Sequence, residues 1–369
     1  MSFQSFAVNF LSSFKVGMAL LGVLLSSCGP TESVDDSRIY RAWDPQNNPQ
    51  NFGSVGLKKF DELPLSGELD RKPWSGYFWP ANKGGIAQRW QASNDKFPWQ
   101  YRSPGLNEIR GMSEQEIDKL SPSEKYDIFM GDYSYALTRF EAERTDQNNP
   151  SWWGLCNGRS SAALIHKEPT ARAVTNMDGI RIRFSSADLK ALLSLAHEKV
   201  DRDLVRWRYI GFRCNQSVSS EDEDLRCDDT NAGSFHLALV HQINVLREGF
   251  VMDRTRDTEV WNRPVYAYRS EVLGEQGPSE RAAPGTVREL KLRTEVDVAD
   301  MINPRQQAQG AVPKTKTYTY RYTIELDEFG RIIGGEWLTW QRPDFLWKAT
   351  FTDPKLFMSG RFEGLKSLL

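Results

Sequence analysis

Cys156 is the residue whose type and setting most clearly predict chemistry. It follows two tryptophans, a glycine and a leucine, and it precedes a run of mostly small residues that is typical of a helix. A thiol at a helix N-terminus lies at the positive end of the helix dipole, which favours thiolate over thiol. The sequence therefore predicts a cysteine nucleophile of the kind that catalyses acyl transfer.

Cys28 ends an N-terminal segment that is typical of an exported lipoprotein. A lysine precedes an apolar run over residues 16–25, which is shorter than the ~20 residues of a membrane-spanning helix. We therefore expect residues 1–27 to be a secretory signal. The sequence Leu-Ser-Ser-Cys resembles a bacterial lipobox, and the alternative is an ordinary signal with an incidental cysteine. Gly29 follows, where an aspartate would indicate retention in the inner membrane.

The expected location is therefore the bacterial cell envelope, at the outer membrane or facing the periplasm. Lipid on Cys28 would be the membrane attachment, because no second apolar span appears in the chain. Residues 28–62 are polar and lack periodicity, so they are expected to be a tether. Residues 63–369 are then the catalytic domain.

The remaining cysteines, Cys214 and Cys227, flank an acidic, serine-rich loop. Export permits disulfides. A bridge across this loop would stabilise the fold by about 3 kcal/mol, because it restricts the conformations of the unfolded chain. Cys156 is then the odd cysteine, which in an exported protein is either buried and inert or a reactive thiol. Its setting favours the reactive thiol.

A cysteine nucleophile needs a base, and the chain has four histidines. His166 lies roughly 15 Å from Cys156 along the same expected helix, and His197 is expected on the surface of another helix. His236 begins an expected strand over residues 235–245, after a glycine and a serine. His241 falls on the opposite face of that strand. His236 is therefore the chosen base, although a histidine at a strand end is often only structural.

Asp253 ends the next expected strand and would neighbour His236 if the two strands pair antiparallel. A carboxylate there would orient the imidazole, while Asp228, Asp229 and Asp257 compete for the role, and a turn-forming aspartate is the simpler reading. The chain order Cys, His, Asp is that of papain-like enzymes and transglutaminases, although such orders recur by convergence. The backbone N–H of the nucleophile and the indole N–H of Trp153 are candidate oxyanion donors, with core packing as the alternative for the indole.

The secondary-structure pattern changes from helical to extended along the chain. This order predicts an α+β fold, with a helical N-terminal half and a nucleophile helix packed on an antiparallel sheet. Capping boxes begin at Ser113 and Ser121. The expected helical ranges are 113–144, 157–167 and 188–200, and the expected strands beyond 235–245 are 250–253, 265–271, 315–326 and 331–341.

Composition and charge exclude some functional classes. The net charge of −2 gives no nucleic-acid footprint. The acidic loop at residues 221–224 fits no calcium-binding template. We therefore predict no metal site and no cofactor, and leave a calcium requirement open.

Several segments carry a family resemblance. Residues 259–268 contain Val-Trp-Asn-Arg-Pro-Val, which resembles the Val-Trp-Asn-Gln-Pro-Val surface peptide of the oomycete transglutaminase elicitor family and its bacterial relatives. Arg263 stands where that family commonly has glutamine, and Arg159 where it usually has tryptophan, which could change the choice of acceptor or help to hold the thiolate. Further similar segments, together spanning roughly residues 63–347, are 120–127, 153–158, 227–236, 333–337 and 342–347.

The resemblance implies a protein-glutamine gamma-glutamyltransferase with Cys156, His236 and Asp253 as its triad. It implies that the thiolate attacks the side-chain amide of a protein glutamine and that His236 protonates the departing ammonia. A lysine or another primary amine would then attack the thioester. Trp261, within the resembling peptide, joins Trp153 as a candidate for the substrate pocket, although both tryptophans could equally pack at a surface or in the core.

Two other classes remain open. A papain-like cysteine hydrolase, either a protease or a glutamine deamidase, would use the same thioester with water in place of the amine. A non-catalytic envelope binding module with a decayed site is the other, and the substitution at Arg159 leaves room for it.

Overall fold

The computed structural model describes residues 44–53, 59–92, 97–201, 203–214, 229–308 and 312–369. The chain divides into two units, Met1–Asp36 and Ser37–Leu369, and the fold below is that of the second. The expected signal segment and Cys28 lie outside the described residues. No helix within the described ranges is both long and apolar enough to cross a membrane.

The first helices are short and well capped. Ser113 and Ser121 accept hydrogen bonds from the backbone N–H groups three residues later, so both expected capping boxes are confirmed. The expected helical stretch over residues 113–144 is, however, three separate helices, because Pro122 opens a new helix and Tyr135 adopts a left-handed backbone conformation. The four helices of this region are α1 (Leu106–Gly111), α2 (Glu114–Asp118), α3 (Pro122–Phe129) and α4 (Ala136–Glu143).

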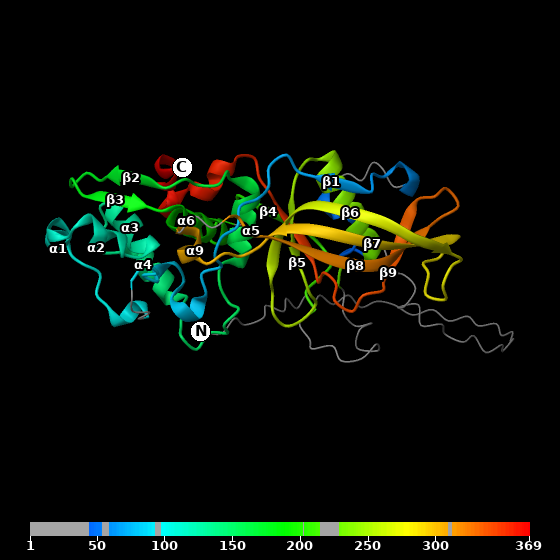
Figure 1. Cartoon of the computed structure of the whole chain (residues 1–369), viewed down its shortest axis with the longest axis horizontal. Helices are drawn as coiled ribbons and strands as arrows, with labels where there is room; N and C mark the ends of the chain where they lie inside the picture. The colour runs from blue at the N-terminus through cyan, green and yellow to red at the C-terminus, as the bar shows by residue number, and fades with distance from the viewer. Residues whose placement is uncertain (1–43, 54–58, 93–96, 202, 215–228, 309–311) are drawn as a thin grey trace, which may run out of the picture. The chain divides into compact units, whose positions relative to one another are not determined.

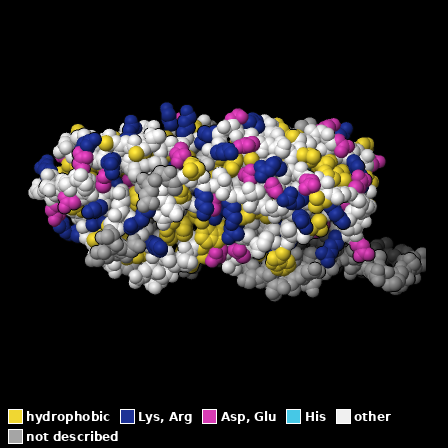
Figure 2. All heavy atoms as spheres, viewed as in Figure 1, with side chains coloured by type: hydrophobic (Ala, Val, Ile, Leu, Met, Phe, Trp, Pro, Cys, Tyr) yellow, Lys and Arg dark blue, Asp and Glu magenta, His cyan; other side chains and the backbone are white. Residues whose placement is uncertain are grey.

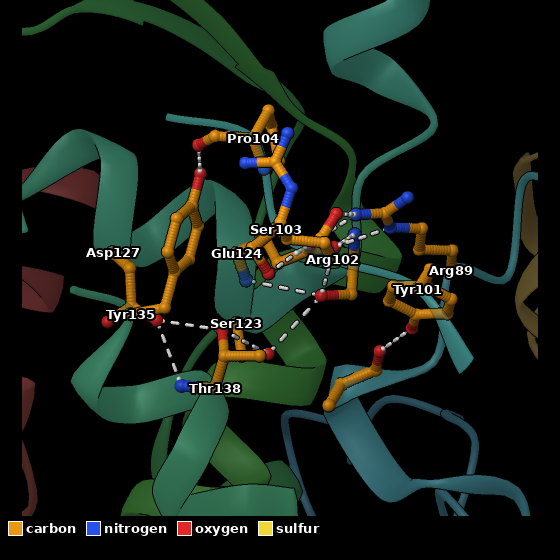
Figure 3. A network of polar contacts seen from close by, with 12 residues as sticks. Arg89, Tyr101, Arg102, Ser103, Pro104, Ser123, Glu124, Asp127, Tyr135 and Thr138 are labelled. Carbon is orange, nitrogen blue, oxygen red and sulfur yellow. Dashed lines mark hydrogen bonds and ion pairs between the residues drawn. The ribbon is translucent and has the colours of Figure 1, made fainter. Parts of the chain in front are cut away.

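A buried polar network fixes α3 and α4 to the segment before them (Figure 3). The Glu124 carboxylate accepts hydrogen bonds from the Arg89 guanidinium and the Ser103 hydroxyl. The Asp127 carboxylate accepts from the backbone N–H and the hydroxyl of Thr138. Both carboxylates are buried, and the hydrogen bonds that they accept offset the cost of removing them from water.

Helices α5 (Cys156–Ile165) and α6 (Ser186–Glu198) pack tightly against each other (Figure 1). Helix α5 also contacts two strands of the sheet, β5 (Phe250–Asp253) and β6 (Asn262–Gln276). A Cβ atom on Gly158 would lie 1.9 Å from the backbone oxygen of Ser194, so only glycine permits this approach. The hairpin of β2 (Arg172–Thr175) and β3 (Arg181–Phe184) connects the two helices. Both expected helices are thus confirmed with shifted ends.

An antiparallel sheet forms the second half of the structure (Figure 1). Its strand order is β4-β10-β5-β6-β7-β8-β9, with β1 paired to β6, so the expected α+β fold is confirmed. The strands expected at 250–253 and 315–326 have those bounds in the structure. The strands are β1 (Ser66–Glu68), β4 (Arg206–Ile210), β5 (Phe250–Asp253), β6 (Asn262–Gln276), β7 (Arg288–Ala299), β8 (Thr315–Leu326), β9 (Ile332–Trp337) and β10 (Leu346–Thr350).

The segment expected to be a strand over residues 235–245 is helical. It forms α8 (Ala232–Val240) and continues as a π-helical turn, η7 (His241–Val245). The side chain of Asn231 accepts hydrogen bonds from the N–H groups of Gly233 and Ser234 and so caps this helix. Periodicity alone does not separate a short apolar run in a strand from one in a buried helix, and here α8 packs on β8 and β9.

The packed chain begins earlier than the expected boundary at residue 63. Phe52 ends η2 (Pro49–Phe52) and Phe60 begins η3 (Phe60–Glu62), and both rings belong to the core beneath the sheet. Residues 44–53 and 59–62 are therefore part of the folded domain and not of a solvated tether. The remaining short helices are η4 (Ala81–Lys83), η5 (Gly85–Ala87), η6 (Pro98–Gln100), α9 (Pro304–Ala308), η8 (Pro354–Met358), η9 (Gly360–Phe362) and α10 (Leu365–Leu368).

The helical part and the sheet each have a hydrophobic core. One gathers the helices and the β2–β3 hairpin, and the other lies between the sheet and α8. On the face in view, acidic and basic side chains are interspersed and no stripe of one sign appears (Figure 2).

Candidate active site

Cys156 is the first residue of α5, and a close backbone crossing holds it there. The N–H of Leu155 donates to the carbonyl oxygen of Phe78 at 2.5 Å. A Cβ atom on Gly154 would lie 2.4 Å from the same oxygen, so this approach requires the glycine. The crossing fixes where α5 begins, and with it the position of the thiol.

The thiol lies on the wall of a pocket of about 650 Å³. Cys156 is 6% exposed and is the free cysteine of the described residues. Aromatic side chains form much of the wall, and the polar lining includes both charges and amides. The lining residues are Ala81, Arg144, Trp152, Trp153, Gly154, Cys156, Asn157, Gly158, His197, Glu198, Val200, Trp207, Tyr209, Arg213, Val260, Asn262, Phe345 and Trp347.

The thiol faces the peptide that carries the family resemblance. Its Sγ atom lies 3.6 Å from the backbone oxygen of Val260 and 3.7 Å from Oδ1 of Asn157. Burial raises the pKa of the Cys156 thiol, and the carboxylate of Glu198 raises it further, against the lowering effect of the Asn262 backbone and two arginines. Burial thus opposes the thiolate that the helix end was expected to favour.

Asn262 is one residue of this site that the sequence reasoning missed. Its Oδ1 accepts from the indole N–H of Trp347 at 2.7 Å, and its Nδ2 donates to Oδ1 of Asn157. Its backbone oxygen accepts from the Ser160 hydroxyl and the Arg159 guanidinium, both at 3.2 Å. The residue thus ties β6 to the first turn of α5. The signal that could have found it is its position inside residues 259–268, the peptide that resembles the elicitor family.

Arg159 is fully buried behind the thiol. Nε and Nη1 of its guanidinium have no hydrogen-bond partner within the described part of the chain. Burial, and then the neighbouring charge of Arg263, lower the pKa of Arg159 to about 9. The arginine that departs from the family pattern therefore lies in α5 itself, three residues after Cys156, and its charge lowers the pKa of the thiol.

Asp253 supports the peptide that faces the thiol. Its Oδ1 accepts from the backbone N–H of Trp261 at 2.8 Å, and Oδ2 has no partner among the described residues. Burial raises the pKa of Asp253 well above its ordinary value. Strand β5 pairs with β10 and β6, so the expected pairing with a strand that carries His236 is wrong. Asp253 is absent from the pocket lining.

His236 lies in α8, against the sheet, and is fully buried. Its Nδ1 is 2.8 Å from the hydroxyl of Tyr322, which in turn contacts the Thr294 hydroxyl. The ring packs beside Phe60, and burial lowers the pKa of His236 to about 4. His236 does not line the pocket that holds Cys156. The described contacts therefore do not assemble the expected Cys156, His236 and Asp253 triad, which stays a prediction.

His197 is the histidine among the lining residues of this pocket. Its Nδ1 lies 2.9 Å from the Ser161 hydroxyl, its Nε2 lies 2.8 Å from Nε2 of His166, and its ring stacks on Phe357. It is 1% exposed, so the expectation of a surface residue is wrong. Burial lowers its pKa well below the ordinary value. With both ring nitrogens engaged, His197 is not a free base.

The two tryptophan candidates differ in position. Trp153 lines the pocket and is 46% exposed. Trp261 is half-buried outside the lining, with its ring against Phe78 and its indole N–H donating to Glu259. Only Trp153 is therefore placed to contact a molecule in the pocket.

The described residues include only one of the two cysteines of the expected disulfide. Cys214 is buried and its N–H donates to the carboxylate of Asp344. Cys227 and the loop at 221–224 lie outside the described residues, so the Cys214–Cys227 bridge stays a prediction. Among the residues that the structure describes, no group of three or more metal-ligating side chains is found.

Comparison with known proteins identifies the chain. Residues 47–284 match the family profile described as "Transglutaminase elicitor". The protein belongs to the transglutaminase elicitor family. No curated protein sequence matches it. Among solved structures, it is similar to the GP42 transglutaminase from Phytophthora sojae, with a TM-score of 0.64 and 20% sequence identity.

The structural match covers 90% of this chain and 96% of GP42. At this identity the match establishes a shared fold. The family profile begins at residue 47, which agrees with the packing of Phe52 and Phe60 into the domain. It also spans the nucleophile helix and the peptide that faces it, so the two halves of the candidate site belong to one elicitor-type domain.

Proposed function

We propose that this member of the transglutaminase elicitor family is an active protein-glutamine gamma-glutamyltransferase. The observation that carries the proposal is the Cys156 thiol, which begins α5 and lines a pocket in a domain with a transglutaminase fold. The thiol is the free cysteine of the described residues, and its pocket is large enough for an extended side chain.

The proposed reaction has two balanced steps. In the first, Sγ of Cys156 bonds to the side-chain carbonyl carbon of a protein glutamine, and the C–N bond breaks to release ammonia, which carries the thiol proton. In the second, a primary amine bonds to the thioester carbon and the C–S bond breaks. The amine loses a proton and the thiol regains one, which leaves an isopeptide bond.

Features of the pocket support this chemistry. The aromatic side chains of Trp207 and Trp347 suit the aliphatic part of a glutamine or lysine side chain, and they exclude water that would hydrolyse the thioester. Trp153 and the N–H of Cys156 are the proposed oxyanion donors. No proton transfer is assigned to His236, since it does not line this pocket.

The proposal includes attachment to the bacterial envelope through lipid on Cys28, after removal of residues 1–27. The apolar run at 16–25 and the lipobox-like sequence support it. Mass spectrometry of the intact protein from bacterial membranes tests this point. A chain that begins at Cys28 with an added diacylglycerol is the expected result, and an unmodified cysteine contradicts it.

The test of the activity uses the chain from Gly29 onward, a glutamine-rich protein and a fluorescent primary amine. We expect amine incorporation and ammonia release, and both are lost in Cys156→Ala. Ammonia release without incorporation would instead identify a glutamine deamidase. If neither occurs while the glutamine-rich protein is cleaved, the protein is a cysteine protease, and silence in all three readouts indicates a binding module.

A further inference from the structure

The pocket around Cys156 needs a group that moves protons. Burial raises the pKa of the thiol, so the thiol must lose a proton as its sulfur attacks, and the departing ammonia must gain one. Among the described residues of the lining, His197 and Glu198 have side chains of the types that serve as general acids and bases. The ordinary pKa of histidine is near neutral, and burial raises that of Glu198 from its ordinary acidic value.

His197 is excluded by its own contacts. One ring nitrogen faces the Ser161 hydroxyl and the other faces His166, while the ring is stacked 3.7 Å from Phe357. An imidazole held in this way has no nitrogen left for a substrate. Its place is structural, between α5, α6 and η8.

Glu198 has the position that His197 lacks. It is the last residue of α6, it is half-buried, and it lines the same pocket as the thiol. Its Oε2 accepts one hydrogen bond, at 3.3 Å, from the backbone N–H of Gly158, two residues after Cys156. A carboxylate can accept several hydrogen bonds, so Glu198 keeps capacity for a substrate. Among the described lining residues it is the one carboxylate.

Glu198 forms no ion pair with a cation among the residues that the structure describes. The Arg144 guanidinium lines the pocket, but it is held by Glu141 of α4 at 2.5 Å. Burial raises the pKa of Glu198, and Lys199 and Arg144 oppose this effect. The groups that act on Glu198 are Lys199 just after α6, Arg144 just after α4, Glu141 of α4, the Gly158 N–H of α5 and, in the same pocket, the Cys156 thiol.

We infer that Glu198 is the acid–base residue of the thioester chemistry at Cys156, in the role expected for His236. The inference rests on the proposed transglutaminase activity. In the first step the Glu198 carboxylate takes the proton of the thiol and passes it to the departing nitrogen, which leaves as ammonia. In the second step it takes a proton from the attacking amine and returns one to the sulfur, as microscopic reversibility requires.

The experiment compares the wild-type domain with Glu198→Gln and Glu198→Asp, with Glu143→Gln as a matched control. Glu143 is an exposed glutamate of α4 outside the pocket lining. We expect Glu198→Gln to lose about 100-fold or more in both ammonia release and amine incorporation. Glu198→Asp should recover part of this loss, and Glu143→Gln should match the wild type.

A second readout does not depend on turnover. The rate at which iodoacetamide alkylates Cys156 is measured against pH, because only the thiolate reacts. The negative charge of Glu198 raises the pKa of the thiol, so the alkylation profile of Glu198→Gln should shift to lower pH. Thermal unfolding of each variant confirms that the fold is retained.

The outcomes separate this inference from the proposed function. If the wild type incorporates amine and Glu198→Gln does so equally well, Glu198 is not the acid–base residue while the transglutaminase proposal stands. If the alkylation profile does not shift, Glu198 does not act on the thiol, and the inference is overturned on that ground alone. A wild type that neither releases ammonia nor incorporates amine, yet shows the shift, overturns the proposed function and with it the catalytic role of Glu198.

Discussion

The surroundings of Cys156 and those of His236 contrast within one domain. Cys156 begins α5 and faces a pocket of about 650 Å³, with a half-buried carboxylate in the same lining. His236 is fully buried in α8, and the hydroxyl of Tyr322 already occupies its Nδ1. Both residue types can do acyl-transfer chemistry, but of the two only Cys156 lines the pocket. Access to a pocket, and not residue type, therefore separates a candidate catalytic group from a structural one.

The two groups also differ in their hydrogen-bond partners. A buried imidazole with a neutral hydroxyl partner is stable as the neutral form, which is why burial lowers the pKa of His236 to about 4. The thiol of Cys156 makes weak sulfur hydrogen bonds, at 3.6 and 3.7 Å, to the Val260 carbonyl and the Asn157 amide oxygen, and it lines the pocket. The sheet core gives His236 one partner, at Nδ1, and encloses Nε2 without a partner among the described residues, while Cys156 lines a pocket.

The largest expected effect is that of Cys156→Ala. Loss of the nucleophile should reduce amine incorporation by about 1000-fold or more, while the melting temperature stays within a few degrees of the wild type. The measurement is incorporation of a fluorescent amine beside a thermal melt. Residual activity above one tenth of the wild type would mean that the pocket around Cys156 is not the site.

Asn262→Ala tests whether the peptide facing the thiol positions α5. The change removes the amide that joins Asn157 and Trp347, so we expect kcat to fall by about 10- to 100-fold through misplacement of the thiol. Steady-state kinetics of ammonia release measure it. Asn244→Ala, which removes an amide outside the pocket lining, is the control and should keep the wild-type kcat.

His236→Gln tests the other region. We expect kcat to stay within about threefold of the wild type, while the free energy of unfolding falls by about 1–3 kcal/mol, because a buried hydrogen bond and packing are lost. Tyr322→Phe removes the partner hydroxyl and should have a similar but smaller effect on stability. Denaturant unfolding and kinetics of the same preparations give both numbers. A folded His236→Gln protein without activity would restore the triad prediction and break the contrast.

The last prediction concerns the pH dependence that His236 gives to stability. The unfolded chain binds a proton on this histidine below its ordinary pKa of 6.5, whereas the folded protein does so only near 4. The stability from the neutral folded form is therefore present above pH 6.5 and is lost as the pH falls toward 4, at about 1.4 kcal/mol per pH unit.

Other buried groups titrate in the same range, so the contribution of His236 is measured as the difference between the wild type and a variant that lacks it. The free energy of unfolding is determined between pH 4 and 6.5 for the wild type and for His236→Gln. The slope of the wild type should be steeper by one proton. Equal slopes would show that His236 exchanges protons freely in the folded state, which would place it in contact with solvent.

Much of the site could be predicted from local sequence. The Trp-Gly-Leu-Cys entry followed by small residues placed a thiol at the start of a helix, because glycine allows the close backbone crossing and small side chains allow the contact with α6. The strand at 250–253 was readable from its β-branched and aromatic residues, and the strand at 315–326 from its alternation of residue types. The resemblance of residues 259–268 to the elicitor peptide marked the segment that faces the thiol.

Tertiary structure alone decided the partners of that thiol. Residues 235–245 were expected to be a strand, but the apolar run is compatible with either a strand or a buried helix, and the sheet surface beside β8 and β9 selected the helix. His236 is therefore not on a strand beside the one that ends at Asp253, and the packing of α6 on α5 places Glu198 in the pocket that Cys156 lines. The sequence thus determined which residue could be a nucleophile, because helix starts are local, while long-range packing determined which charged group shares its pocket.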